Sequence, residues 1–171
     1  MKSISELRKA HKGQTLSVIG RGASLARLMP YHIEPGPVIA INQAIEAVEE
    51  LEFPNPLYSM QKDMVFTLDT RAILLLHEPE SAKHAKVPGA YVWSNEKFKI
   101  DTDKPSTVSC VVIGKFWGCK QINFLCCDAS IDGSLETYGA PPKTPKDYLL
   151  HKALVEEIAQ REKIKINWVK I

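Results

Sequence analysis

Short apolar runs that alternate with segments of helical character constrain this chain more than any other feature. The longer runs lie at residues 15–19, 38–41, 72–76, 121–127 and 164–168, with short ones at 56–60 and 91–93. Runs of this length, bounded by turn residues, are typical of buried strands. Strands that alternate with helices favour a parallel sheet with helices on both faces. We therefore expect an α/β fold: one Rossmann-like, doubly wound domain over residues 1–171 with a mainly parallel sheet.

The segments between these runs predict the helices. Their expected ranges are 3–12, 23–29, 43–51, 106–118 and 147–162, and residues 63–70 also have helical character. Residues 77–105 and 128–145 contain several Gly, Pro and polar residues and are predicted to be irregular. Ser106 and Thr107 suit an N-cap at the start of their helix.

Composition favours an ordinary globular protein over a membrane or nucleic-acid-binding one. Apolar residues make up 44% of the chain and charged residues 25%, with a net charge of +2. No apolar stretch approaches the length of a membrane span, and the polar N-terminus does not resemble a signal peptide. We therefore expect a cytoplasmic protein with no membrane partner and no electrostatic reason to bind nucleic acid.

The four cysteines lack the spacing of a zinc site. They are Cys110, Cys119, Cys126 and Cys127, without C-x-x-C pairs. Buried free thiols in a reducing compartment are the expected state.

The first apolar run ends in a glycine-containing turn, Gly20-Arg21-Gly22-Ala23-Ser24. Glycines there let the backbone approach a ligand, and N–H groups at a helix start attract anions. Leu25 replaces the third glycine of G-x-G-x-x-G, and no acidic residue ends the second run, so a nucleotide phosphate is favoured over NAD. A tight strand-to-helix turn without a ligand is the alternative.

Polar residues follow two other predicted strands. Asn42 and Gln43 follow the second run, and Asp128 follows the run over 121–127. Carboxyl ends of parallel strands meet at one edge of a sheet, so these loops should share one crevice with the glycine turn. The Asn42 amide suits recognition of a base or ribose, or the cap of the next helix. Further candidate ligand-binding residues are Ser106, Thr107 and Ser130.

Three segments, taken in order, resemble a known group of enzymes. They are GRGASL at 20–25, IAINQ at 39–43, and STVSCVVIGKFWGCKQINFLCCD at 106–128. Their order and spacing are similar to those of the bacterial sialyltransferases of glycosyltransferase family 42. They also resemble the related MptE-like hydroxymethylpterin pyrophosphokinase superfamily, small phage proteins included. The final segment ALVEEIAQREKIKINWV extends the resemblance over most of the chain.

The resemblance implies a Rossmann-like domain that binds a CMP-sugar. It implies phosphate at the glycine turn, the nucleotide at Asn42, tyrosines near Asp128 that assist the leaving phosphate, and a histidine base before the last helix. Tyr138 stands roughly in the place of one tyrosine, and Ser130 replaces the other. The segment before the last helix has no histidine, and His151 lies about one turn inside that helix.

The predicted catalytic residues are therefore Asp128, Tyr138 and His151. A general base must reach the proton that it removes. His77 and His84, in the irregular stretch over 77–105, are further candidates for that role.

The leading interpretation is a glycosyltransferase-like enzyme with a nucleotide-activated, CMP-sugar-like donor and no metal or cofactor. An ATP-dependent pyrophosphokinase is an alternative that would need magnesium, with Asp63, Asp128 and Asp132 as candidate ligands. A non-catalytic nucleotide- or partner-binding protein of the same fold is a third possibility, motivated by the missing histidine. The acceptor, the presence of enzyme activity and the formation of a homo-oligomer stay open.

Overall fold

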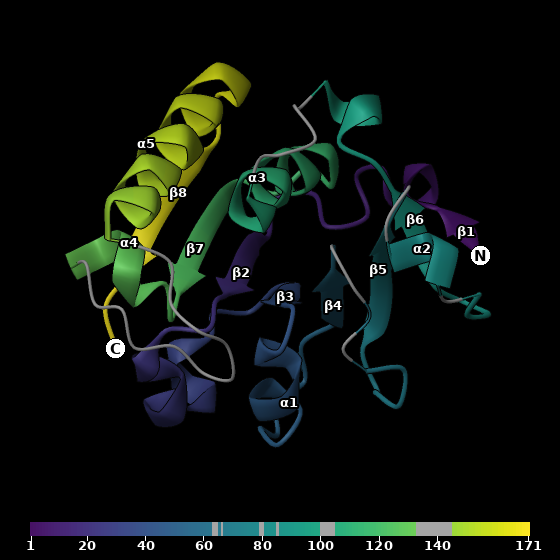
Figure 1. Ribbon diagram of the computed structural model, residues 1–171, viewed down its shortest axis with the longest axis horizontal. Helices are drawn as coiled ribbons and strands as arrows, with labels where there is room; N and C mark the ends of the chain where they lie inside the picture. The colour runs from purple at the N-terminus through teal and green to yellow at the C-terminus, as the bar shows by residue number, and fades with distance from the viewer. Residues whose placement is uncertain (63–64, 66, 79–80, 85, 100–104, 133–144) are drawn as a thin grey trace.

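A single sheet of eight strands dominates the computed structural model, which describes residues 1–62, 65, 67–78, 81–84, 86–99, 105–132 and 145–171 (Figure 1). The strands are β1 Lys2–Ser3, β2 Thr15–Ile19, β3 Val38–Ile41, β4 Leu57–Gln61, β5 Ile73–His77, β6 Tyr91–Trp93, β7 Gln121–Leu125 and β8 Lys165–Val169. Their spatial order is β1-β6-β5-β4-β3-β2-β7-β8, and all neighbours run parallel. The predicted α/β, Rossmann-like, mainly parallel sheet is confirmed.

The direction in which strands are added reverses once, beside β2. From β2 the chain adds β3, β4, β5 and β6 on one side. The helix α3, Ser106–Phe116, then carries the chain back to β7, which pairs with the other side of β2. The switch point of the sheet thus lies between β2 and β7, and Figure 1 shows both termini at opposite edges.

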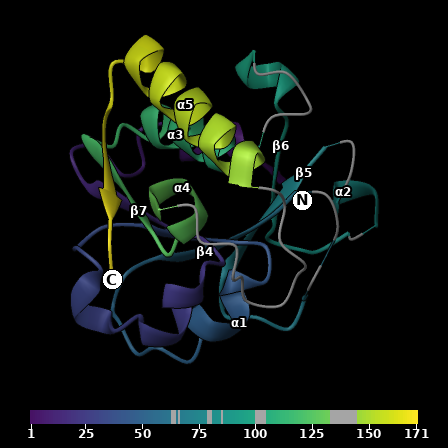
Figure 2. The same ribbon diagram turned by 60° about the vertical axis from the view of Figure 1, so that its left-hand side comes forward.

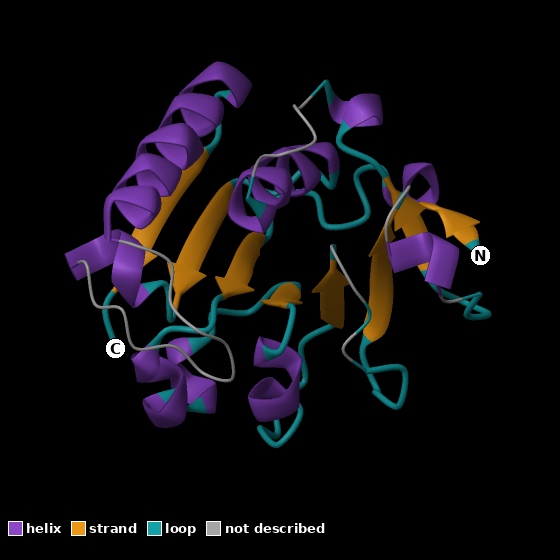
Figure 3. Cartoon of the chain, viewed as in Figure 1, coloured by secondary structure: helices purple, strands orange, loops and turns teal. Residues whose placement is uncertain are grey.

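Helices cover both faces of the sheet (Figures 2 and 3). One face packs against α3 and against α5, Pro145–Glu162. The other packs against α1, Ala44–Val48, and the 3₁₀ helix η2, Ala23–Arg27. Because both faces are covered, every residue of β2, β3 and β4 is buried, which explains their nearly continuous apolar sequences.

The shorter elements fall at strand connections. They are the 3₁₀ helices Ile4–Leu7, Pro30–His32 and Glu96–Phe98 and the helices α2 Ser81–His84 and α4 Asp128–Asp132. α4 lies beside α5 near the carboxyl ends of β7 and β8 (Figure 1).

Several predicted boundaries are wrong for local reasons. The helix expected over 3–12 shortens to Ile4–Leu7, because Lys9 adopts a left-handed backbone conformation with φ of 59°. The helix expected over 23–29 is a five-residue 3₁₀ helix. The loop expected from 128 begins instead with α4. Residues 67–70 are not helical, and the other residues of 63–70, apart from 65, lie outside the described ranges.

Among the described residues, no helix has the combination of length and apolar character needed to cross a membrane.

A buried histidine, His11, links the N-terminal segment to the sheet near the amino-terminal ends of the strands. The Nε2 atom of His11 lies 2.8 Å from the hydroxyl of Tyr58, and its ring contacts Trp117. Burial lowers the pKa of His11 below its usual value, an effect that the hydrogen bond with Gln14 partly offsets. Burial also raises the pKa of Tyr58 to about 12, with smaller contributions from Tyr91 and Cys119. His11 is therefore packed in its neutral form.

We expect stability to fall as the pH drops below about 6.5, the usual pKa of histidine in an unfolded chain. Below that pH the folded state binds fewer protons at His11 than the unfolded state does. The contribution of neutral His11 to the free energy of unfolding is therefore complete above pH 6.5 and is lost as the pH falls through the lowered pKa of the folded state. Urea unfolding between pH 5 and 8 measures the slope. His11→Gln, which does not titrate, should flatten it, whereas His32→Gln should not. An unchanged slope in His11→Gln would place the acid sensitivity elsewhere.

Candidate functional site

The switch point of the sheet brings the glycine turn and the end of β7 together. In open α/β sheets, ligands bind at the carboxyl ends of the strands where the strand order reverses. Here that position lies between the turn after β2, residues 20–24, and residues 126–128 after β7. The sequence interpretation placed its candidate site at these two segments and at Asn42, which follows the neighbouring strand β3.

The glycines of the turn allow it to lie directly against the end of β7. The Gly20 N–H donates to the Leu125 carbonyl at 2.9 Å, and the Gly22 N–H to the Cys126 carbonyl at 2.7 Å. A Cβ atom at Gly20 would lie 2.7 Å from the Cys126 oxygen, and one at Gly22 would overlap the Asp128 carboxylate. Contact between two turns thus requires both glycines, whether or not a ligand is bound.

The Asp128 carboxylate completes this contact. Its Oδ2 atom accepts the Ser24 N–H and its Oδ1 atom accepts the Ser24 hydroxyl, both at 2.7 Å. Ser24 is 1% exposed. The N–H groups of Gly20, Gly22 and Ser24 therefore have protein acceptors before any ligand arrives. The predicted catalytic residue Asp128 belongs, in this arrangement, to the support of the glycine turn.

Arg21 extends from the same turn toward β3. Its guanidinium donates to the Gln43 Oε1 atom at 2.6 Å, and both side chains are half-buried. Among the described residues, no carboxylate lies within ion-pair distance of Arg21. A guanidinium carries five N–H donors, so one bond to Gln43 orients the group and leaves donors for a further anion.

Asn42 presents a buried acceptor to which no described residue donates. It adopts a left-handed backbone conformation with φ of 53°, and its N–H donates to the Met60 carbonyl at 2.8 Å. Its Oδ1 atom is buried without a hydrogen-bond partner in the described part of the chain. α1 begins after Gln43 with no side-chain cap, so the capping role considered for Asn42 is not found. Buried polar atoms usually have partners, which makes this oxygen a candidate ligand contact.

The remaining predicted residues lie in α3, α4 and α5 or fall outside the described part of the chain. Ser106 and Thr107 are the first two residues of α3, where Pro105 holds the N-cap position and no side chain caps the helix, so the N-cap prediction is wrong. Ser130 is buried in α4, and its N–H donates to the Cys127 carbonyl. His151 is half-buried in α5. Tyr138 and Asp63 lie outside the described residues.

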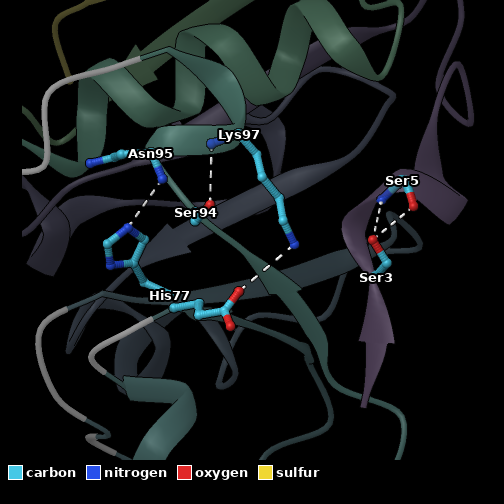
Figure 4. A network of polar contacts seen from close by, with 7 residues as sticks. Ser3, Ser5, His77, Ser94, Asn95 and Lys97 are labelled. Carbon is cyan, nitrogen blue, oxygen red and sulfur yellow. Dashed lines mark hydrogen bonds and ion pairs between the residues drawn. The ribbon is translucent and has the colours of Figure 1, made fainter.

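A buried polar cluster that the sequence interpretation missed lies at the ends of β4, β5 and β6, and Figure 4 shows two of its members, His77 and Asn95. Its buried members are Gln61, Lys62, His77, Ser81, Asn95 and Ser109. His77 ends β5 rather than lying in a loop, and its Nε2 accepts the Asn95 N–H at 3.2 Å. The sequence signal was available: each apolar run here ends in a polar residue, as at Gln61 and His77.

This cluster fixes the positions of three strand ends. The Ser81 hydroxyl donates to the Gln61 carbonyl at 2.5 Å and accepts the His77 N–H at 2.8 Å. The Ser109 hydroxyl of α3 donates to Asn95 at 2.9 Å. Because His77 Nε2 accepts a backbone proton and its ring is fully buried, His77 is a support of the edge rather than an accessible base.

The cysteines are free thiols that do not suit nucleophilic chemistry. Three of them are buried, and Cys127 is half-buried. Burial raises the pKa of the Cys119 and Cys126 thiols to about 12 and raises those of Cys110 and Cys127 as well. Thiolates are the reactive form, so these environments disfavour reaction. Within the described ranges, no group of three or more His, Cys, Asp or Glu residues is arranged to hold a metal ion.

Comparison with known proteins identifies no family: no protein-family model matches the sequence, and no curated protein matches it.

Proposed function

We propose that the protein is a glycosyltransferase-type enzyme that binds a nucleotide-activated sugar at the carboxyl ends of β2 and β3. One observation carries the proposal: two neighbouring polar groups lack a complementary partner among the described residues. No donor reaches the buried Oδ1 atom of Asn42, and no carboxylate pairs with the Arg21 guanidinium, which donates to the adjacent Gln43. A nucleotide is complementary to this pair, because its base and ribose offer donors while its phosphate carries negative charge.

The proposed reaction is displacement at the anomeric carbon of the sugar. An acceptor hydroxyl forms the new bond to that carbon, the bond to the phosphate oxygen breaks, and the nucleotide leaves with the electron pair. Arg21 would stabilise the charge that develops on the leaving phosphate, as preorganised cations do. The hydroxyl proton passes to a base, for which His151 in α5 and His84 at the end of α2 are the candidates from the described helices.

A nucleotide-binding protein without transferase activity is the second candidate. The position of Asp128 favours it, because that carboxylate is engaged by two donors of Ser24 and is thereby removed from the set of available bases. The pyrophosphokinase alternative differs from both in requiring magnesium.

Titration calorimetry with CMP, UMP, AMP, GMP and ATP, with and without magnesium, tests nucleotide binding. We expect a nucleoside monophosphate to bind without magnesium. Asn42→Ala should weaken that binding by about 1–3 kcal/mol, because a ligand donor then loses its buried acceptor. Asn167→Ala, which removes a similar amide from the edge strand β8, is the matched control and should leave affinity unchanged.

Donor hydrolysis then separates the candidates. Release of nucleotide from a nucleotide sugar by the wild-type protein supports the transferase, and binding without any release supports the binding protein. Magnesium-dependent binding of ATP alone would favour the pyrophosphokinase. A lower melting temperature in Asn42→Ala with unchanged nucleotide affinity would contradict the assignment of Asn42 to the ligand.

A further inference from the structure

We propose that Asp128 is a positioning residue: its carboxylate is a built-in anion that holds the glycine turn against β7 and so orients Arg21 toward β3. The part of this inference that concerns the ligand rests on the proposed nucleotide site. The part that concerns the turn stands on contacts within the protein.

Alternate residues of the turn donate to the β7 side. Gly20 donates to Leu125, Gly22 to Cys126, and Ser24 to the side chain of Asp128. The hydrogen bonds between β2 and β7 therefore continue beyond both strands. Arg21 lies between two of these donors, and its side chain reaches Gln43, which follows the neighbouring strand β3. The orientation of Arg21 is thus tied to the contact that Asp128 completes.

A carboxylate suits this position better than an amide. Ser24 offers two donors, its N–H and its hydroxyl, and each has its own Asp128 oxygen at 2.7 Å. An asparagine has one acceptor oxygen, so it can satisfy only one of the two strongly. Hydrogen bonds to a charged acceptor are also stronger than those between neutral groups.

The same contact makes two parts of the turn differ in the anion that they can bind. Ser24 binds the Asp128 carboxylate, and Arg21 keeps donors for the anion of a ligand. The Ser24 donors, where an incoming phosphate would otherwise compete, are already occupied by Asp128. The guanidinium of Arg21 keeps donors beyond the one that it gives to Gln43. Asp128 therefore acts on ligand binding through Arg21, and it neither transfers a proton nor touches the phosphate.

The first experiment needs no ligand. Thermal unfolding of Asp128→Asn, Ser24→Ala and the double variant measures their coupling. Each single variant should lower the Tm by about 2–8 °C, and the double variant should lose little more than the worse single one. The matched controls are Ser17→Ala, which removes a buried hydroxyl with no hydrogen-bond partner among the described residues, and Asp69→Asn at an exposed position.

Formate tests whether an anion is what the turn requires. In Asp128→Ala, sodium formate should recover part of the lost Tm, whereas sodium chloride at the same ionic strength should not. Neither salt should distinguish wild type from Asp69→Ala. Additive losses in the double variant together with the absence of formate rescue would overturn the proposal, since Asp128 would then contribute only bulk or helix-terminal charge.

The second experiment uses CMP as the probe and Arg21→Met as a second background. Asp128→Asn should raise the Kd for CMP about tenfold in the wild-type background and leave it unchanged when Arg21 is absent. With a hydrolysable CMP-sugar, Asp128→Asn should raise KM and also lower kcat, because Arg21 stabilises the leaving phosphate, and it should change neither when Arg21 is absent. A large loss of kcat with unchanged CMP affinity would make Asp128 catalytic and overturn the positioning role.

The two experiments distinguish failure of the proposal from failure of the proposed function. Wild-type protein that does not bind CMP, with formate rescue and thermal coupling present, refutes CMP as a ligand and supports the role of Asp128 in the turn. CMP binding that does not change in Asp128→Asn refutes the positioning role and leaves the nucleotide site intact.

Discussion

Gly22→Ala is expected to destabilise the protein by about 3 kcal/mol, the upper end of the usual cost of overpacking, because the site cannot relax. The added Cβ would overlap the Asp128 carboxylate and lie 2.8 Å from the Cys126 carbonyl oxygen. Both neighbours are fixed by hydrogen bonds from the same turn, because Gly22 donates to Cys126 and Ser24 to Asp128. Urea unfolding followed by circular dichroism measures the loss.

Gly13→Ala separates this overlap from the general cost of replacing a glycine. Gly13 has φ of 77°, and no described atom lies within 4 Å of the position that a methyl group would take there, so the substitution costs only backbone strain of about 1–2 kcal/mol. Combining Gly22→Ala with Asp128→Gly should restore part of the stability, since one of the two obstructions is removed. A Gly22→Ala protein as stable as wild type would show that the turn does not lie against β7.

The strands of this protein are the part of the fold that the sequence predicts best. The ranges expected for β2, β3 and β6 match the structure, because these runs are buried on at least one face and flanked by turn residues. β7 ends two residues earlier than expected. Its apolar run continues into Cys126, whose left-handed backbone, with φ of 55°, ends the strand. The apolar pattern does not predict that Cys126 adopts a left-handed backbone conformation.

Short helices were harder to predict for a physical reason. α4 spans five residues, which is too short for a 3.6-residue periodicity to emerge, and it stands at the start of a segment rich in Gly and Pro. η2 was expected to be longer, but it ends at Arg27 as a 3₁₀ helix.

The order of the strands could not be predicted from the sequence either. The pairing of β1 with β6, for example, joins residues about ninety positions apart.

The sequence predicted that the glycine turn, Asn42 and Asp128 follow neighbouring strands at one edge of the sheet, but it did not predict the contacts between them. Polar residues at the ends of apolar runs indicated the carboxyl edge, and parallel strands brought the glycine turn, Asn42 and Asp128 to neighbouring strand ends. The sequence could not reveal that Asp128 accepts both donors of Ser24, 104 residues away. That contact occupies the donors of Ser24, so in the proposed function the phosphate is recognised by the side chain of Arg21 and not by backbone N–H groups.

Arg21→Met should weaken nucleotide binding by about 10- to 150-fold. A hydrogen bond to a charged group contributes about 1.5–3 kcal/mol, which corresponds to that range. Methionine keeps the apolar part of the side chain, so the fold and the packing beside Gln43 should persist. Titration calorimetry with CMP, supported by unfolding curves of both proteins, measures the two effects separately.

Arg21→Lys and Arg8→Met define what the binding depends on. Lysine keeps the charge but cannot make two parallel hydrogen bonds to a phosphate while also donating to Gln43, so its affinity should lie between those of wild type and Arg21→Met. Arg8 is exposed near the opposite edge of the sheet, and its loss tests for a general effect of net charge. An equal loss of CMP affinity in Arg8→Met and Arg21→Met would mean that binding depends only on the net charge of the protein. Weakening confined to Arg21, with partial rescue by lysine, would place the phosphate at the guanidinium that Gln43 holds.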